Sequence, residues 1–260
     1  MTDTFLIIIG LTISFIATSL GALFVFFING TISEKLNSII SGFSAGIMIS
    51  ASVWGLLIPS FDYSNYLNNL YFLPSIIGTI LGCLFLVLID AIAKVTQKSG
   101  DFLQTPQQNN NLKSFIIAFT IHNIPEGMAI GFAFGNAIAS NSTTLLASSF
   151  MIAIAISIQN IPEGLAVALP VYKTTKNKTK AFFIGTLSGI VEPIFALFGF
   201  FLAGIAKIII PWLLAFSAGT MLFVAVNDLI PDSKLENKKH GAWSFVFGFI
   251  IMMLLDVLLG

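Results

Sequence analysis

From Leu112 to Asn136 the sequence is LKSFIIAFTIHNIPEGMAIGFAFGN, an apolar run with one polar motif at its centre. A helix of about 20 apolar residues crosses roughly 30 Å of hydrocarbon, so this run is long enough to span a bilayer. The motif HNIPEG would then lie near the middle of the membrane. Because ionisable residues are costly at that depth, a glutamate there indicates a functional site.

The whole chain has the composition of an integral membrane protein. Of its 260 residues, 56% are hydrophobic and 9% are charged, and the mean hydropathy is +0.95. A soluble domain has about 25% charged residues, so the composition excludes an ordinary soluble globular protein. Apolar runs of sufficient length predict an all-α protein with eight transmembrane helices in a single transmembrane domain, residues 1–260. The predicted spans are 5–28, 36–58, 72–93, 112–136, 145–171, 181–205, 208–230 and 242–259, with a flexible cytoplasmic loop at about 96–111.

The lysines predict how these spans are oriented. All twelve basic residues are lysines, and with the N-terminus outside every one except Lys207 falls in a cytoplasmic connection. By the positive-inside rule, both termini are therefore extracytoplasmic, which agrees with an even number of spans. The absence of arginine and the abundance of lysine, asparagine and isoleucine suggest an AT-rich bacterial genome. The expected location is the cell (inner, cytoplasmic) membrane, with a multi-pass topology.

Two motifs recur within the chain. The segment 122–127, HNIPEG, returns as QNIPEG at 159–164, and FSAGIM at 43–48 returns as FSAGTM at 216–221. By the lysine topology, the two copies of each motif cross the membrane in opposite directions. Such inverted repeats are typical of secondary transporters, whose binding sites lie where the repeats meet near the midplane.

Three carboxylates are predicted to share the midplane depth. Glu126, Glu163 and Glu192 each fall near the centre of a span, and no lysine lies at that level. Bare charges would cost roughly 2.5 to 3.5 kcal/mol each on insertion scales, so these groups must be protonated, paired or bound to cations. A multivalent cation would satisfy all three at once, and protonation alone is the alternative.

Helical spacing favours the cation. His122 and Glu126 are separated by one turn and face the same way, as do Gln159 and Glu163. Asn123 and Asn160 add two amides, and each motif proline is expected to kink its helix and free a backbone oxygen. This mixture of nitrogen and oxygen donors suits Zn²⁺, Mn²⁺, Fe²⁺ or Co²⁺ better than Mg²⁺ or Ca²⁺.

The paired HNIPEG and QNIPEG motifs resemble those of the ZIP (Zrt/Irt-like) divalent metal-ion transporters, most of all the bacterial GufA-type members. The resemblance covers nearly the whole chain and implies an inverted 3+2+3 arrangement around a kinked central helix pair. It also implies a two-metal site at mid-membrane depth. The first site implied consists of Met48, His122, Glu126, Gln159 and Glu163. The second consists of Asn123, Glu126, Asn160, Glu163 and Glu192, so that both motif glutamates bridge the ions.

The chain departs from the family pattern at two positions. Asn227 stands where many relatives have a histidine, although Asp228 keeps the acidic residue that follows, and the two mark the expected exit path to the cytoplasm. Gln159 replaces a histidine that many eukaryotic members carry, which makes the first site less selective for zinc on grounds of ligand softness.

The function expected is uptake of a divalent transition metal into the cytoplasm, with zinc favoured and iron, manganese, cobalt or cadmium as alternatives. The metal is both substrate and bound ion, and no organic cofactor, catalytic residue or enzyme activity is expected. The partners expected are metal ions, the lipid bilayer and a second copy in a homodimer, without nucleic acid. Two other functions remain open: a membrane-embedded metalloenzyme, and a proton-coupled carrier of an organic solute with the glutamates as relay.

Overall fold

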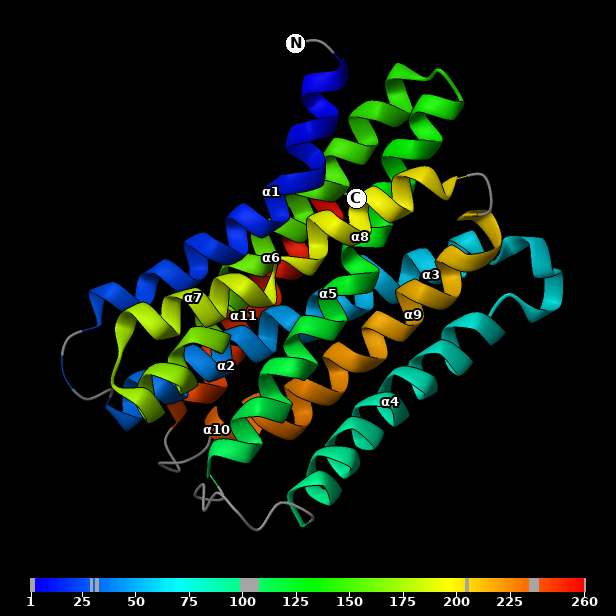
Figure 1. Ribbon diagram of the computed structural model, residues 1–260. Coiled ribbons are helices and arrows are strands. Elements are labelled where there is room, and N and C mark those ends of the chain that lie inside the picture. The colour runs from blue at the N-terminus through cyan, green and yellow to red at the C-terminus, as the bar shows by residue number, and fades with distance from the viewer. Residues whose placement is uncertain are drawn as a thin grey trace.

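The structure, a computed structural model, describes residues 3–28, 30, 33–98, 108–203, 206–233 and 239–259 (Figure 1). All regular secondary structure in these segments is helical, as the composition predicts. The α-helices are α1 (Asp3–Leu23), α2 (Glu34–Ser50), α3 (Ile58–Tyr63), α4 (Leu73–Lys98), α5 (Gln108–Ala139), α6 (Thr143–Thr175), α7 (Lys178–Ser188), α8 (Val191–Phe201), α9 (Ala206–Val224), α10 (Ile230–Ser233) and α11 (Lys239–Leu259). Short 3₁₀ segments, η1 (Phe24–Phe27) and η3 (Asn65–Leu70), and π-helical segments, η2 (Ala51–Leu57) and η5 (Ala225–Leu229), join or extend them.

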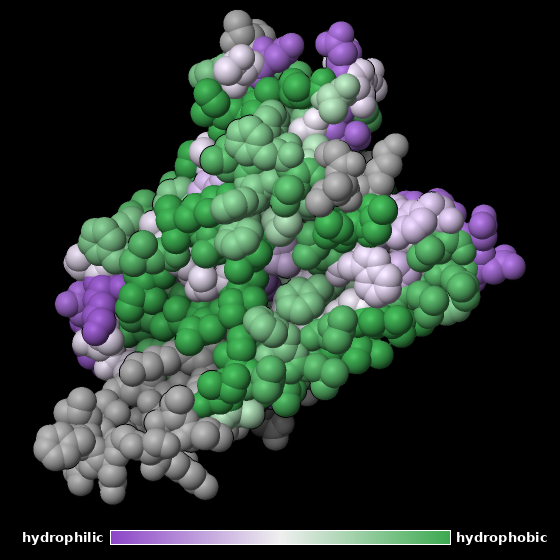
Figure 2. Space-filling view, turned by 45° about the vertical axis from the view of Figure 1, so that its right-hand side comes forward, coloured by the Kyte–Doolittle hydropathy of each residue, from purple (hydrophilic) through white to green (hydrophobic). Residues whose placement is uncertain are grey.

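The helices have the length and composition of membrane spans. Within the described residues, six helical stretches are long and apolar enough to cross a bilayer, and Leu73–Ile89 is a shorter apolar helix. Figure 2 shows a broad hydrophobic band across one face of the molecule, with hydrophilic residues gathered toward its ends. The protein is therefore a multi-pass membrane protein. The stretches are Asp3–Phe27, Glu34–Tyr63, Thr143–Thr175, Lys178–Phe201, Ile208–Ser233 and Lys239–Leu258.

Two of the predicted spans contain a π-helical turn that the sequence did not predict. In η2 the N–H of Ile58 bonds to the carbonyl of Val53, and in η5 the N–H of Ile230 bonds to that of Ala225. A proline follows directly in both places, at Pro59 and Pro231. Proline lacks an N–H and its ring clashes with the carbonyl four residues earlier, so a locally wider turn accommodates it.

The predicted sixth span is not one continuous helix. Helix α7 ends at Ser188, and α8 begins at Val191 after a turn at Gly189 and Ile190. A Cβ atom at Gly189 would lie 2.9 Å from Cβ of Thr18, so the turn also packs closely on α1. The break places Glu192 in the first turn of α8. By contrast, α5 and α6 remain helical through Pro125 and Pro162.

Glycines bring neighbouring helices into backbone contact in two groups. In the first group, Gly164 of α6 packs on α1 and Gly127 of α5 packs on α8. In the second, Gly46 of α2 packs on α11 and Gly219 of α9 packs on α4, which runs along the outside of the bundle (Figure 1). Helix α5 joins the groups by also packing against α9. The paired motifs thus lie in the interior of the first group.

The predicted loop at 96–111 is shorter at its flanks than expected. Helix α4 continues to Lys98 and α5 begins at Gln108, while residues 99–107 lie outside the described residues. Gln97 and Lys98 are good helix formers, which favours the extension of α4, whereas the extension of α5 runs through three asparagines and has no explanation in helix propensity.

Candidate metal centre

The two repeated motifs meet in the interior. His122 and Glu126 come from α5 and Glu163 comes from α6, and one ligand atom from each lies within 4.8 Å of the others. Nε2 of His122 is 3.0 Å from Oε2 of Glu163, so the imidazole and carboxylate of opposite motifs are in direct contact. The exposed fractions of the three residues are 0%, 0% and 2%. The arrangement is a closed cluster of one nitrogen and two carboxylate ligands.

Glu192 extends this cluster along α8. It is fully buried, and its Oε2 accepts a hydrogen bond of 2.7 Å from Nδ2 of Asn160 in the second motif. A Cβ atom at Gly127, directly after Glu126, would lie 2.3 Å from the carbonyl oxygen of Glu192. The glycine therefore lets the backbone of α8 approach the first motif. Asn123 is anchored nearby, because its Nδ2 donates to the carbonyl of Ser188 at 3.2 Å.

Unpaired atoms in the cluster are almost all acceptors. Within the two repeated motifs, five buried side-chain oxygens have no hydrogen-bond partner: Oδ1 of Asn123 and of Asn160, both carboxylate oxygens of Glu126, and Oε1 of Glu163. Nε2 of Gln159 is the one unpaired donor of the two motifs, and Gln159 lies beside Glu126. Buried polar groups normally find partners, so this surplus of acceptors calls for a positive charge. A divalent cation fits such a donor set.

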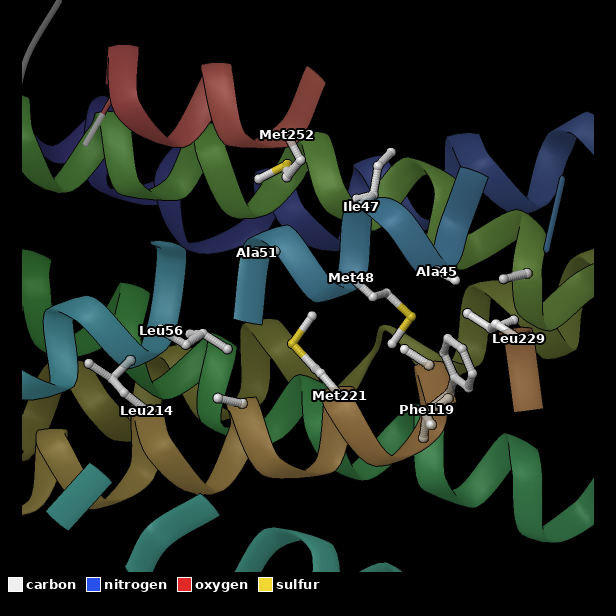
Figure 3. Packing of buried hydrophobic residues seen from close by; sticks show 14 of the residues in the cluster. Ala45, Ile47, Met48, Ala51, Leu56, Phe119, Leu214, Met221, Leu229 and Met252 are labelled. Carbon is white, nitrogen blue, oxygen red and sulfur yellow. The ribbon is translucent and has the colours of Figure 1, made fainter. Parts of the chain in front are cut away.

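Met48 lies in the hydrophobic core over this cluster. Its side chain is fully buried in α2 and belongs to the same core cluster as Phe119 and Met221. Figure 3 shows the side chains of Met48, from α2, and Met221, from α9, extending into the space between these helices. The Phe119 ring packs edge-on against His122 with 5.1 Å between ring centroids. Met48 thus shares a hydrophobic cluster with Phe119, the residue whose ring contacts His122.

Asn227 and Asp228 lie apart from the buried cluster. Both are in η5, where Nδ2 of Asn227 donates to Oδ1 of Asp228 at 3.1 Å in an exposed setting. Because they stand in η5, the π-helical segment that follows α9, their local backbone departs from the regular helix that the sequence predicts.

A cavity of about 1000 Å³ leads toward the cluster from one end of the bundle. Its wall includes Gln159, which also belongs to the second motif, and two acids, Asp62 and Asp256. Trp54, Tyr63 and apolar residues of α5, α6 and α9 complete much of the lining. The cavity therefore joins a polar mouth to one residue of the buried centre.

Comparison with known proteins identifies the family of this buried centre. The family model described as ZIP Zinc transporter matches residues 96–256, which include both motifs and Glu192. The chain belongs to the ZIP family. It is 32% identical to zinc transporter ZIP11 of Xenopus tropicalis over 97% of each chain. It is also 32% identical to zinc transporter GufA of Myxococcus xanthus, over 94% of this chain and 95% of the relative.

The ZIP chain also matches bacterial relatives along its full length. Its identity to zinc transporter ZupT of Lysinibacillus sphaericus is 32%, with all of both chains covered. The resemblance to bacterial ZIP members, predicted from the paired motifs, is thereby confirmed. Because the match to ZupT covers all of this chain, every described helix lies within the region that is similar to a ZIP relative.

Three residues around the ZIP centre were not predicted from the sequence. Thr18 of α1 donates to Oε1 of Glu192 at 3.1 Å, Ser188 of α7 accepts from Asn123, and Ser217 of α9 donates to the carbonyl of His122 at 3.2 Å. For Ser217 the repeated FSAG motif was an available indication. Thr18 and Ser188 lie in no repeated motif, because their contacts depend on how α1 and the α7–α8 turn pack.

Proposed function

We propose that the protein carries a divalent transition metal, with zinc favoured, into the cytoplasm through the buried centre. The observation that carries this proposal is the juxtaposition of His122, Glu126 and Glu163, whose ligand atoms lie within 4.8 Å in a fully buried setting. Mixed nitrogen and carboxylate donors bind zinc, iron, manganese or cobalt, and cadmium is a further candidate substrate. The curated relatives, which are named zinc transporters, support zinc as the first choice.

The centre is proposed to hold two ions. Met48, His122, Glu126, Gln159 and Glu163 form the first site, and Asn123, Glu126, Asn160, Glu163 and Glu192 form the second. Support comes from the number of side chains: the two sets together contain eight, whereas one ion takes about four to six ligands. Three of the five unpaired oxygens belong to Glu126 and Glu163, the glutamates that both sets share. The burial of all eight side chains, none more than 3% exposed, supports a site that keeps water out.

The proposed topology is a single domain, residues 1–260, that crosses the membrane eight times. Its helices form an inverted 3+2+3 repeat around a kinked central pair. The two π-helical turns support the repeat, because each follows a copy of the FSAG motif and precedes an Ile-Pro pair. Related halves would carry the same local irregularity at equivalent places. The lysine distribution supports extracytoplasmic termini and placement in the cytoplasmic membrane.

The route proposed for the metal begins at the cavity. The C-terminal part of α11 and the N-terminal part of α9 line it, and the lysine distribution assigns both to the outside. Asp62 and Asp256 would attract a cation there, and Gln159 would pass it to His122. Asn227 and Asp228 would receive it near the inner end of α9. A partner copy in a homodimer is compatible with this route, since the centre is built from one chain.

Radioactive zinc uptake into cells tests the proposal. The Glu126→Ala and Glu163→Ala variants should lose uptake, because each removes a proposed bridging ligand. The matched control is Glu34→Ala, which removes an exposed glutamate from the first turn of α2 and should leave uptake unchanged. Parental rates in both site variants would refute the centre as the transport site.

Metal analysis of the purified protein separates the proposal from the two other functions. No bound divalent metal after zinc loading would favour a proton-coupled carrier of an organic solute. Hydrolysis of a lipid or peptide, with no zinc flux in proteoliposomes, would favour a metalloenzyme.

A further inference from the structure

Helix α1 contributes a hydroxyl to the carboxylate that the second site needs. The Oγ1 atom of Thr18 lies 3.1 Å from Oε1 of Glu192, and both residues are at most 1% exposed. The other oxygen of Glu192 accepts from Asn160 on α6. The carboxylate is thus held by donors from two different helices, one of which carries neither repeated motif.

Close packing keeps Thr18 in this place. A Cβ atom at Gly189 would lie within 2.9 to 3.0 Å of three side-chain atoms of Thr18, so the α7–α8 turn covers the hydroxyl directly. A Cβ atom at Gly164, next to Glu163, would lie 2.0 Å from the carbonyl of Thr18. Only glycine at these two positions allows α1 to approach both Glu163 and Glu192 so closely.

The hydroxyl of Thr18 has two acceptors for one hydrogen. Besides Glu192, its Oγ1 is 3.1 Å from the carbonyl oxygen of Ser14, one turn earlier on α1. The contact with Ser14 keeps Oγ1 on the side of α1 that faces Glu192. A carboxylate has about four acceptor positions, so Glu192 can accept from Thr18 and still offer a lone pair to a metal ion.

Ser14 places a second hydroxyl beside the same carboxylate. Its side chain is fully buried and lies close enough to Glu192 to interact with it. Among the described residues its Oγ has no hydrogen-bond partner in the geometry present. Ser14 thus offers Glu192 a second hydroxyl from α1, beside that of Thr18.

We propose that Thr18 is a positioning residue of the second metal site, which holds Glu192 in place with Ser14 as the neighbouring hydroxyl. This inference rests on the proposed function, because it requires Glu192 to bind metal. Groups that orient metal ligands in this way typically change metal affinity by about 10- to 100-fold when they are removed. The second ion should therefore bind about 10- to 100-fold more weakly without the hydroxyl, while the first ion is retained.

Zinc titration of the purified full-length protein tests this inference. Thr18→Val removes the hydroxyl and keeps the side-chain shape, whereas Thr18→Ser keeps the hydroxyl. The matched control is Thr12→Val on the same helix, where the lost hydroxyl bonds to the backbone oxygens of Ile8 and Ile9. Bound zinc is counted by elemental analysis after equilibrium dialysis against graded free zinc, and elution as a single species checks folding.

The expected result is two ions in the parental, Thr18→Ser and Thr12→Val proteins, with the second step alone weakened in Thr18→Val. Parental titration of Thr18→Val would overturn the inference and leave the proposed function standing. So would equal weakening in Thr18→Val and Thr18→Ser, which would indicate packing rather than hydrogen bonding. A parental protein that binds no zinc at all would overturn both.

Discussion

Replacing Gly127 by alanine should weaken the second proposed metal site and leave the first intact, without removing any ligand. Gly127 follows Glu126 on α5 and packs against the backbone of Glu192 on α8. An added Cβ would lie 2.3 Å from the carbonyl oxygen of Glu192 and 2.9 Å from its Cα, and both contacts are with backbone. Ordinary contact begins at 3.4 Å, so α8 must retreat by about 1 Å.

A shift of this size is large for a metal site. Ligand distances in metal centres are held within about 0.2 Å, so a retreat of about 1 Å takes Glu192 out of bonding range of an ion that Glu126 still holds. The first site keeps its ligands, because none of them comes from α8. We therefore expect Gly127→Ala to bind one zinc ion as the parental protein does and to bind the second at least 10-fold more weakly. Overpacking should also lower stability by about 1 to 3 kcal/mol.

Zinc titration and a thermal unfolding curve in detergent measure both effects. Gly55→Ala is the matched control, since its Cβ would meet a single atom, Oδ1 of Asp256, at an ordinary 3.5 Å. That variant should titrate and unfold like the parental protein. If Gly127→Ala binds both ions with parental affinity, the close approach of α5 and α8 has no part in the second site and the reasoning fails.

Three other changes have defined outcomes. Gln159→His adds a nitrogen ligand to the first site, so zinc affinity relative to manganese should rise by about 10-fold or more in competition titrations. An unchanged ratio of the two affinities would place residue 159 outside the ligand shell. Gly82→Ala places a Cβ 2.2 Å from the carbonyl of Phe216 and should lower the melting temperature by separating α4 from α9, with both zinc affinities retained; loss of zinc binding would contradict the separation of α4 from the centre. Lys173→Met removes the donor that Nζ of Lys173 provides to Oδ1 of Asn37 between α6 and α2, and a thermal unfolding curve should show a lower melting temperature. An unchanged melting temperature would contradict a stabilising role for this contact.

The helices could be predicted from the sequence because the hydrophobic runs are long and their polar ends are clear. Their internal irregularities could not. The break at Gly189 lies four residues before Pro193, and the π-helical turns of η2 and η5 end just before Pro59 and Pro231. A proline must disturb the helix on its N-terminal side, so the sequence indicates that each irregularity is near. The type of disturbance depends on neighbouring helices, because the turn at Gly189 packs on Thr18, a residue far away in the chain.

The relative positions of the candidate ligands could be predicted to the extent that spacing within one helix decides them. His122 and Glu126 are one turn apart, so their common face follows from helical geometry alone. Predicting that His122 and Glu163 lie close together required the repeat as well. The repeat indicated that the two motifs cross the membrane in opposite directions and meet near its middle. No sequence pattern points to the contact of Thr18 with Glu192. A threonine in an apolar helix usually donates to a backbone carbonyl one turn earlier, as Thr18 also does to that of Ser14.

The balance of donors and acceptors in the centre favours a metal ion over a proton as the proposed occupant. A proton on Glu126 would convert one of the five unpaired motif oxygens into a donor, which can satisfy one further acceptor. Oδ1 of Asn123, Oδ1 of Asn160 and Oε1 of Glu163 would compete for it, and at least two would remain unpaired. A divalent ion, in contrast, accepts several oxygen ligands at once and neutralises two carboxylates. The five oxygens that are costly without a cation would therefore become ligands of the proposed ions, and this argument gives the amides of both motifs a part beside the glutamates.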